Sequence, residues 1–389
     1  MKIVMLCDLF IDSLQYQENL LAKYYVKNGH DVVVIASTFN NTFDFFANKY
    51  NKNIPASSYD FNGIKIVKQP YSINIYNRLR KLKNVAKILQ EEKPDLIFAH
   101  DIYLDLTEAA RYVKNNPECR LIMDYHADYS NSAKNWLSLN ILHKIIRKYI
   151  LYKAKPYISK IFPVVPESAK FLNEVYGIPH SEMELLILGS DTDLADEMKT
   201  TGQASKIRDQ YNISKHDIVI FTGGKITPFK RTDLVIEAFL KIPNQNVHLF
   251  IVGDTSEENK TYKNHLLDIS NGNDRIHFTG WLNTFDIYKY MSACDIAVFP
   301  KSQSVLWQQA ISSGLALIVG LVLGNNVSYL NKYKCIIELK ENEITSGIIV
   351  EKIAALLNNR DLLKEIQESA LKTSNELLNY DKIVIQTLS

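Results

Sequence analysis

Alternation of short apolar, strand-like runs with helical patterns is the feature that most constrains the fold of this chain. The first half begins with KIVML, continues with a helical pattern near residues 15–28, and has four further runs: DVVVIAS, DLIFAH, RLIMDYH and KIFPVVP. A second series consists of DIVIFTGG at 217–224, HLFIVGD, RIHFTG, DIAVFP and ALIVG. Strands separated by helices predict a parallel sheet with helices on both faces. The two series therefore predict an α/β protein with one such sheet in each half.

The length of the chain also favours two domains, because 389 residues exceed what one hydrophobic core usually organises. The polar stretch 192–215 has no strand-like run and is the expected linker, including a short helix. We therefore expect a first domain over 1–191 and a second over 216–370. Helical periodicity runs through 347–378, and we expect 371–389 to form a helical tail that packs back towards the first domain.

Composition and cysteine spacing narrow the class of protein. With 46% hydrophobic and 23% charged residues, the composition is that of a folded chain, and no run of about 18 apolar residues predicts a transmembrane helix. The apolar start is too short for a signal peptide, so a cytoplasmic location is expected. The four cysteines are far apart and predict neither a disulfide framework nor a zinc site: Cys7, Cys119, Cys294 and Cys335.

Two lysines follow the first strand-like run of the second series. In GGKITPFKRTDLVIEAF, Gly223 and Gly224 permit a tight turn, and Lys225 and Lys230 precede an amphipathic helix. Free N–H groups and the helix dipole add to the lysine charges, so this segment predicts an anion site. A tight strand-to-helix turn with solvated lysines is the alternative. The signature G-x-x-x-x-G-K-[ST] is absent, which disfavours a P-loop kinase or ATPase.

The order and spacing of several motifs resemble those of family 4 glycosyltransferases. They are GGKITPFKRTDLVIEAF, LFIVGD, RIHFTGW, YMSACDIAVFP and QQAISSGLALIV, preceded by NGHDVVVIAS, VPESAKFLNEVYGIP and LLILGSDTD. The resemblance implies the GT-B fold, with two Rossmann-like domains facing each other across a cleft. It also implies a retaining, metal-independent enzyme without a cofactor. The second domain would bind a nucleotide diphosphate sugar, with a UDP-sugar favoured, and the first would bind the acceptor.

The same resemblance assigns the donor diphosphate to the segment after the first strand of the second domain. Lys225 stands where the family commonly has arginine, and Lys230 where it has lysine. Lysine keeps the charge but lacks the two-pronged hydrogen bonding of a guanidinium. Gly224 lies beside them, and family members also hold phosphates with main-chain N–H groups at the start of a later helix. Here those donors would belong to Ser304, Val305 and Leu306.

The segment FPKSQSVLWQQAISSG departs from the family pattern because it contains no Asp or Glu. Gln309 stands where the family has the ribose-binding glutamate of its Glu-x7-Glu motif, and an amide can still bond hydroxyl groups. The first glutamate has no counterpart, and the stretch is about three residues shorter than usual. We expect Gln303 and Ser304 to reach the transferred sugar and Trp281 to lie near the base. A simple packed helix is the alternative.

Candidates in the first half follow the strand-like runs. His126 matches a family histidine that contacts the donor sugar, and an imidazole can bond a hydroxyl group or move a proton near neutral pH. The family's Gly-Gly pair is absent near residues 12–13, which puts its close backbone contact in doubt. Glu18 could instead be a solvated residue at a helix start. The acceptor-side candidates are Asp12, Ser13, Glu18, His100 and Asp101.

The positive charge is concentrated in the first half. Residues 1–190 hold 24 basic and 19 acidic side chains, and residues 191–389 hold 21 and 24. Two basic segments stand out, 76–89 and 142–160, and the first has a helical pattern typical of helices that lie on anionic bilayers. We expect peripheral binding at the inner face of the plasma membrane, with ordinary exposed basic helices as the alternative. No motif for nucleic-acid binding accompanies these residues.

The resulting hypothesis is a retaining glycosyltransferase that moves a hexose-type sugar to a hydroxyl group of a glycan or lipid-linked acceptor, in the biosynthesis of surface polysaccharide or glycoconjugate. Loss of both family glutamates and of the glycine pair motivates an alternative: a catalytically degenerate GT-B protein that binds and stabilises an active glycosyltransferase. A sugar-nucleotide epimerase of the same architecture is a third hypothesis.

Overall fold

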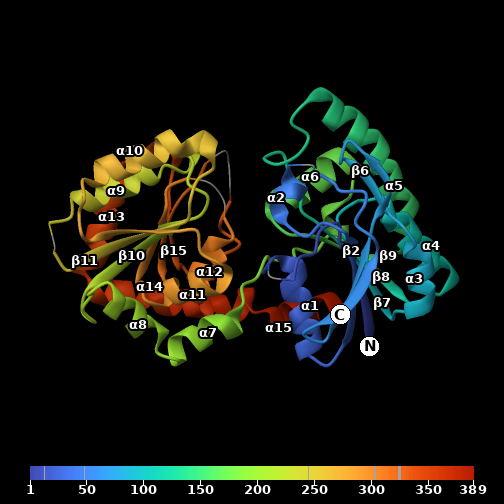
Figure 1. Ribbon diagram of the computed structural model, residues 1–389, viewed down its shortest axis with the longest axis horizontal. Coiled ribbons are helices and arrows are strands. Elements are labelled where there is room, and N and C mark those ends of the chain that lie inside the picture. The colour runs from blue at the N-terminus through green and yellow to red at the C-terminus, as the bar shows by residue number, and fades with distance from the viewer. Residues whose placement is uncertain (13, 48, 244, 302–303, 323–325) are drawn as a thin grey trace. The chain divides into compact units, whose positions relative to one another are not determined.

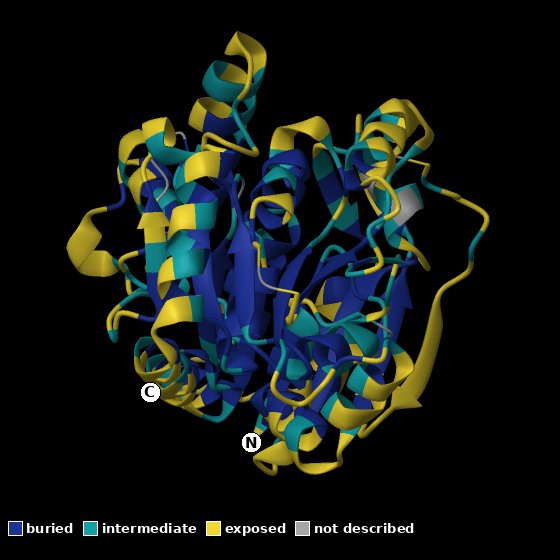
Figure 2. Cartoon of the chain, turned by 90° about the vertical axis from the view of Figure 1, so that its left-hand side faces the viewer, coloured by how far each residue is buried: buried dark blue, intermediate teal, exposed yellow. Residues whose placement is uncertain are grey.

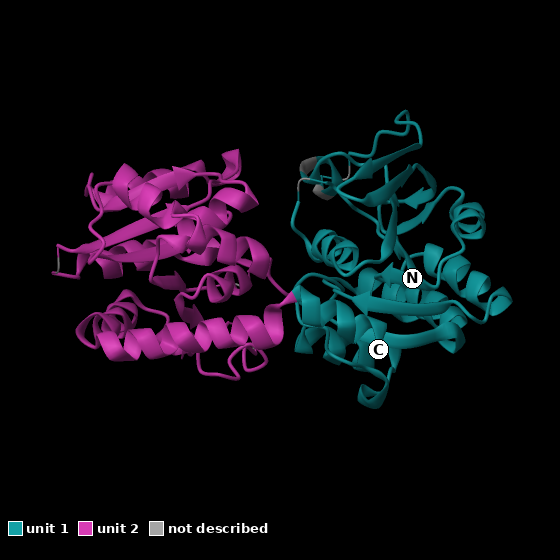
Figure 3. Ribbon diagram, turned by 90° about the horizontal axis from the view of Figure 1, so that it is seen from below, with its two compact units in different colours: residues 1–188, 380–389 teal, residues 189–379 magenta. Residues whose placement is uncertain are grey.

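The computed structural model describes residues 1–12, 14–47, 49–243, 245–301, 304–322 and 326–389. The chain divides into two compact units (Figure 3). Unit 1 consists of Met1–Leu188 together with Tyr380–Ser389, and unit 2 is Gly189–Asn379. The last ten residues therefore belong to the same unit as the N-terminal half.

Unit 1 is built on a seven-stranded sheet with helices on its two faces (Figure 1). Only the edge pair β3–β4 is antiparallel; all other neighbours are parallel. The order across the sheet is β3 (Ser57–Phe61), β4 (Ile64–Gln69), β2 (Asp31–Ser37), β1 (Lys2–Leu6), β7 (Leu96–His100), β8 (Arg120–Tyr125) and β9 (Ile158–Pro163).

The central strands are apolar because both of their faces are covered. In β1, Ile3 and Met5 belong to one hydrophobic core, and Val4 and Leu6 belong to another. Such strands occur as continuous apolar runs and not as alternating ones. Figure 2 shows buried strands in dark blue among helices that are partly exposed.

The helices of unit 1 include one from the far end of the chain. Its helix α15 packs on α1, where Tyr25 and Thr387 share a hydrogen bond and Lys27 forms a 2.7 Å ion pair with Asp381. A π-helical segment, Ser138–Arg147, runs directly into α5. The α-helices are α1 (Gln17–Lys27), α2 (Thr42–Phe46), α3 (Val85–Glu92), α4 (Asp105–Asn115), α5 (Lys148–Ala154), α6 (Pro166–Phe171) and α15 (Tyr380–Leu388).

Unit 2 has a six-stranded, fully parallel sheet. Its order is β12 (Ile276–Gly280), β11 (Val247–Val252), β10 (Ile218–Gly223), β13 (Ile296–Phe299), β14 (Ala316–Gly320) and β15 (Ile336–Leu339). Its helices are α7 (Thr192–Thr200), α8 (Gln203–Gln210), α9 (Thr232–Leu240), α10 (Lys260–Ser270), α11 (Thr284–Ser292), α12 (Leu306–Ser312), α13 (Ser346–Asn358) and α14 (Arg360–Thr373).

The single helix predicted over 76–89 is wrong. Strand β5 (Tyr71–Ile75) pairs with β6 (Leu79–Leu82) as an antiparallel hairpin, and α3 starts only at Val85. Tyr76 and Asn84 have positive φ angles of 49° and 60°, which no continuous helix allows. The basic character is also not all on the surface, because Arg80 is buried in an ion pair of 2.7 Å with Asp8.

Local capping explains where the helices of unit 2 begin. Residues 192–215, expected as a linker with a short helix, hold both α7 and α8, and the Asp191 side chain accepts from the Leu194 N–H at the start of α7. The periodic stretch 347–378 is interrupted at Asn359, whose side chain accepts from the N–H of Leu362 and starts α14. An unsatisfied first turn is the reason that such side chains start helices.

Long apolar helices do not occur in the part of the chain described: none there has both the length and the hydropathy needed to cross a bilayer. All four cysteines are buried and carry free thiols.

Candidate functional site

Each sheet has a position where the order of its strands reverses, and most candidate residues lie there. In unit 1 this position is β1–β7, and in unit 2 it is β10–β13. In parallel sheets, ligands bind outside the carboxyl ends of the strands at such a point. His100 ends β7, Lys225 follows β10, and Ser304 follows β13.

Backbone contacts tie together the loops after β10, β11 and β12. The N–H of Gly224 donates to Val252 O at 2.8 Å, and the N–H of Gly253 donates to Gly280 O at 2.9 Å. A Cβ atom on Gly253 would overlap the carbonyl oxygen of Gly224. Only glycine allows this approach, so the first loop, which carries Lys225, is held by the second.

Lys230 stands in a short 3-10 turn, Pro228–Lys230, ahead of α9. Its ammonium group packs against Gly224, because a Cβ atom on Gly224 would overlap Lys230 Nζ and lie 3.4 Å from Leu306 Cδ1. Across the described ranges no hydrogen bond or ion pair engages Nζ, and burial lowers the pKa of the amine. A partly buried cation without a partner favours an anionic ligand. Lys225, by contrast, is exposed.

The start of α12 is partly occupied by its own chain. The N–H of Leu306 donates to Ser304 Oγ at 3.3 Å, and the N–H of Trp307 donates to Ser304 O at 3.0 Å. One of the N–H groups expected to face phosphate is therefore engaged within the protein. Val305 is exposed, and Gln303 lies outside the described residues.

Gln309 lies on α12 and is buried. Its side chain lies near the hydroxyl of Tyr288, which lies 2.5 Å from Ser190 Oγ and accepts from the Asp191 N–H at 3.0 Å. Its carbonyl oxygen Oε1 has no hydrogen-bond partner among the described residues. An orphaned acceptor of this kind can take the hydrogen of a ligand hydroxyl. Trp281 follows the edge strand β12 and is 66% exposed.

Three side chains meet at the carboxyl ends of β7 and β8 in unit 1. The imidazole of His100 has Nδ1 at 2.8 Å from Asp124 Oδ2, and His126 has Nε2 at 3.3 Å from the same oxygen. Asp124 is fully buried within β8, whereas a third of the His126 side chain is exposed. The sequence analysis found both histidines but not the carboxylate between them. The i, i+2 spacing of Asp124 and His126 was the available clue.

The carboxylate controls the charge of both imidazoles. Burial alone would lower the pKa of His126, but the negative charge of Asp124 outweighs it and raises the pKa to about 9. His100 responds in the same way, with a pKa well above its usual value. Burial would raise the pKa of Asp124, but the two imidazoles hold it well below its usual range. Near neutral pH both rings therefore carry positive charge beside one carboxylate.

The other acceptor-side candidates occupy separate positions. Asp12 accepts from the hydroxyl of Tyr59 at 3.1 Å, and Asp101 has a positive φ of 69° with its carboxylate on the N–H of Ile102. Glu18 lies in the first turn of α1, close to His100 and His126. Ser13 lies outside the described residues.

Two family models match the chain in succession. The model described as Glycosyltransferase Family 4 matches residues 19–194, and the model described as Glycosyl transferases group 1 matches residues 203–373. The chain belongs to glycosyltransferase family 4. The resemblance seen in the motifs is thereby confirmed. No curated protein sequence matches this family 4 chain.

Solved structures share the GT-B fold of this family 4 protein. Alr3699/HepE of Anabaena in complex with UDP has a TM-score of 0.69 and 16% identity, covering 100% of this chain and 98% of that one. A glycosyltransferase from Rickettsia africae ESF-5 has a TM-score of 0.68 and 17% identity, with 100% and 96% covered. WaaG, a glycosyltransferase involved in lipopolysaccharide biosynthesis, has a TM-score of 0.61 and 15% identity, with 99% and 98% covered.

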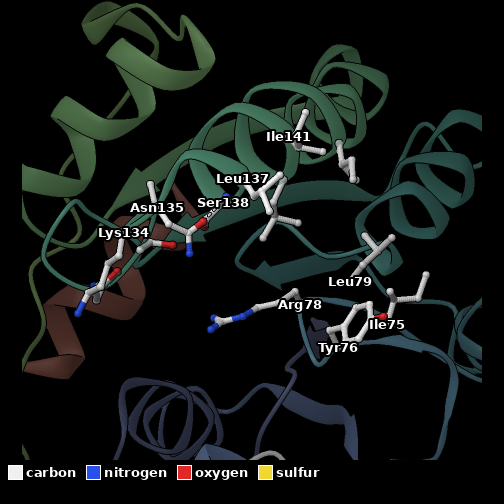
Figure 4. Close-up of a pocket in the computed structure, with 14 residues that line it drawn as sticks. Ile75, Tyr76, Arg78, Leu79, Lys134, Asn135, Leu137, Ser138 and Ile141 are labelled. Carbon is white, nitrogen blue, oxygen red and sulfur yellow. Dashed lines mark hydrogen bonds between the residues drawn. The ribbon is translucent and has the colours of Figure 1, made fainter.

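Unit 1 of this family 4 protein also has an apolar cavity of about 470 Å³. Figure 4 shows the turn and strand that carry Tyr76, Arg78 and Leu79 on one side, and the helix that carries Leu137 and Ile141 on the other. The sequence analysis did not foresee it, because the hairpin β5–β6 replaces the predicted helix.

A second buried cluster in unit 1 was also missed. Arg80 pairs with Asp8, whose Oδ1 accepts from the hydroxyl of Tyr71 at 2.5 Å. The guanidinium of Arg80 lies over the rings of Phe45, Tyr71 and Tyr103. With its charge paired and its faces covered by rings, this arginine stabilises the hairpin from inside.

Proposed function

We propose that this protein transfers a sugar from a nucleotide diphosphate to a hydroxyl group of a glycan or lipid-linked acceptor, with retention of configuration and without a metal ion on the diphosphate. The observation that carries the proposal is the ammonium group of Lys230, packed against Gly224 at the end of β10 without a partner among the described residues. The HepE structures in complex with UDP and with UDP-glucose support UDP as the nucleotide.

The proposed chemistry needs charge stabilisation and no enzyme nucleophile. The bond between the sugar C1 and the diphosphate oxygen breaks, and the acceptor oxygen bonds to C1 from the same face. The proton of the acceptor hydroxyl goes to a diphosphate oxygen. Lys230 and Lys225 would stabilise the negative charge that grows on the diphosphate, and removing one such preorganised group commonly costs about 3 to 4 kcal/mol.

The remaining second-domain residues would bind the donor. Gln309 Oε1, which is buried and unpartnered among the described residues, would accept from a ribose hydroxyl. Trp281 is exposed enough to stack on a base. In unit 1, the His126 imidazolium would donate to a sugar hydroxyl.

We also propose that the apolar cavity of unit 1 faces the anionic inner leaflet of a membrane, where a lipid-linked acceptor resides. Exposed apolar side chains surround it, and Trp136 and Leu137 are each 67% exposed. Of the basic side chains, Arg78 and Lys134 line the cavity, and Lys144 and Lys148 lie on the helical segments that follow. An apolar surface with a basic rim is the combination that binds anionic bilayers. The basic side chains of the proposed membrane surface therefore come from the hairpin turn and from residues 134–154, and not from a helix over 76–89.

A turnover assay with UDP-glucose and other nucleotide sugars tests the transfer. Lys230→Ala should lower turnover at least 100-fold and leave the melting temperature within a few degrees. Lys215→Ala is the matched control, because Lys215 is an exposed lysine of the same unit that precedes β10, whereas Lys225 and Lys230 follow that strand. Near-normal turnover in Lys230→Ala would contradict the assignment.

The degenerate GT-B protein is the second candidate function, favoured by the start of α12, where Ser304 accepts from the N–H groups of Leu306 and Trp307. Calorimetry with UDP, GDP and their sugars separates the two. Micromolar binding that Lys230→Ala abolishes supports a transferase. Absence of binding to all of them supports the binding partner.

A further inference from the structure

We propose that Glu18, His100 and His126 form a binding site for one divalent transition-metal ion in unit 1, and that zinc is the ion best suited to it. This site goes beyond the proposed sugar transfer, which places no metal on the diphosphate. Two imidazoles and one carboxylate are a common ligand set for zinc, with a further coordination position left open.

The fold brings the three ligands together from separate elements. His100 ends β7, His126 stands just after the neighbouring strand β8, and Glu18 lies in the first turn of α1. One ligand atom from each residue lies within 4.8 Å of the other two. All three belong to unit 1, so the site does not depend on unit 2.

The coordinating atoms become available when zinc displaces the proton that each imidazolium carries near neutral pH, so binding should weaken as pH falls. Because Nδ1 of His100 faces Asp124, its other nitrogen, Nε2, remains, and this atom is buried without a hydrogen-bond partner among the described residues. His100 is only 4% exposed, so solvent does not satisfy that nitrogen. Within the described ranges, neither the Glu18 carboxylate nor a ring nitrogen of His126 is engaged in a hydrogen bond. A buried nitrogen without a partner is costly, and a metal bond would relieve that cost.

Asp124 provides the outer support that metal-binding histidines usually have. Its Oδ2 lies 2.8 Å from His100 Nδ1, in a hydrogen bond that orients this ring, and 3.3 Å from His126 Nε2. A carboxylate behind a ligating histidine fixes its orientation and increases its basicity. Together, Glu18 and Asp124 carry the two negative charges that balance a divalent cation.

A modest movement would complete the site. Atoms that share one tetrahedral zinc ion lie roughly 3.4 Å apart, as follows from bonds of about 2.1 Å. Ligand atoms now spread over up to 4.8 Å must therefore close by about 1.4 Å at most. Glu18 is only partly buried at the start of a helix, and rotation of its side chain can supply this movement.

The metal and the sugar would compete for His126, because a ring nitrogen that binds zinc cannot also donate to a hydroxyl. Binding is therefore measured on the full chain without a nucleotide sugar. After treatment with a chelator, the protein is titrated with zinc chloride against a chromophoric competitor. We expect one zinc ion per chain with a dissociation constant of about 10 μM or tighter. Cobalt should give the visible absorption of a tetrahedral site.

Variants identify the ligands. Glu18→Gln and His126→Ala should each weaken zinc binding at least 10-fold, and Asp124→Asn should weaken it by about 10- to 100-fold. Glu118→Gln and His180→Ala change exposed residues of unit 1 and should leave the affinity unchanged. Circular dichroism of each variant checks that it is folded.

The outcome separates this proposal from the proposed transfer. Lys230→Ala should lose nucleotide binding and keep zinc binding. Glu18→Gln should lose zinc binding and keep nucleotide binding. Failure of the wild-type chain to bind zinc with the expected affinity would overturn the metal site, as would binding that Glu18→Gln and His126→Ala both leave intact. Neither result would contradict the proposal that the protein binds a nucleotide sugar.

Discussion

Lys230 Nζ lies so close to Gly224 that a Cβ atom on the glycine would overlap it. The contact joins the turn before α9 to the loop after β10, two segments that the phosphates of a nucleotide would have to reach together. Hydrogen bonds from Gly224 to Val252 and from Gly253 to Gly280 hold the loop from the other side. The ammonium group can therefore take this position only because residue 224 is a glycine and has no Cβ atom.

Gly224→Ala should displace Lys230 and weaken UDP binding at least 10-fold in calorimetry. It should also destabilise the protein by about 1 to 3 kcal/mol, because φ at this residue is +109°. Gly202→Ala is the matched control, with φ of +70° and no atom within 4 Å of the added Cβ. This control should also be destabilised by its positive φ angle, but it should bind UDP with unchanged affinity. Equal UDP affinity in the two variants would argue against the role of the contact.

The double variant Trp136→Ser, Leu137→Ser should bind vesicles of anionic phospholipid at least 10-fold more weakly than the unmodified chain in a sedimentation assay. Each side chain is 67% exposed, and its transfer into lipid would be favourable. Ile385→Ser is the control, because Ile385 is 61% exposed on α15, away from the cavity. Binding of the native chain should also weaken as salt rises, because basic side chains contribute to it. Unchanged vesicle binding in the double variant would count against the surface.

The stability of unit 1 should fall as pH rises from about 4 to 7. Burial raises the pKa of Asp105 to about 7, although the N–H of Leu82 donates to its carboxylate. In the unfolded chain this group ionises near pH 4, so over that interval the folded state binds more protons, and stability decreases with pH. The contribution is at most roughly 4 kcal/mol. Asp105→Asn should flatten this part of the urea-unfolding profile, whereas Asp60→Asn, at an exposed position, should not. Parallel profiles for all three proteins would refute the prediction.

The stability of unit 2 should instead fall as pH decreases from about 6.5 to 4. Burial, together with the nearby His248, lowers the pKa of His277 to about 4, while Asp274 acts weakly in the other direction. The two rings are stacked, with centroids 5.5 Å apart. An unfolded histidine takes up its proton near pH 6.5, so stability is present above that pH and is lost as pH falls towards 4. His277→Phe keeps an aromatic ring and should reduce the acid sensitivity of the melting temperature. An unchanged slope between pH 6.5 and 4.5 would show that another group is responsible.

The sequence alone predicted the buried strands of both sheets. KIVML forms β1, DLIFAH contains β7, and DIVIFTGG contains β10, because strands covered on both faces must be continuously apolar. The same physics predicted the α/β class and, through the positions of glycine and lysine after β10, the loop that holds Lys225 and Lys230. These features depend on residues close together in the chain.

The tertiary structure decided the rest. Leu79 and Leu82 fit a helical spacing, yet they lie in a strand whose Arg80 is buried in an ion pair with Asp8, a residue 72 positions away in sequence. Asp124 could not be recognised as a partner of His100, since only the pairing of β7 with β8 brings them together. In the same way, only the fold brings Leu306 close to Gly224 and Lys230. Local pattern determines which segments bury both faces, but the charge of a buried side chain depends on groups that the fold brings from elsewhere.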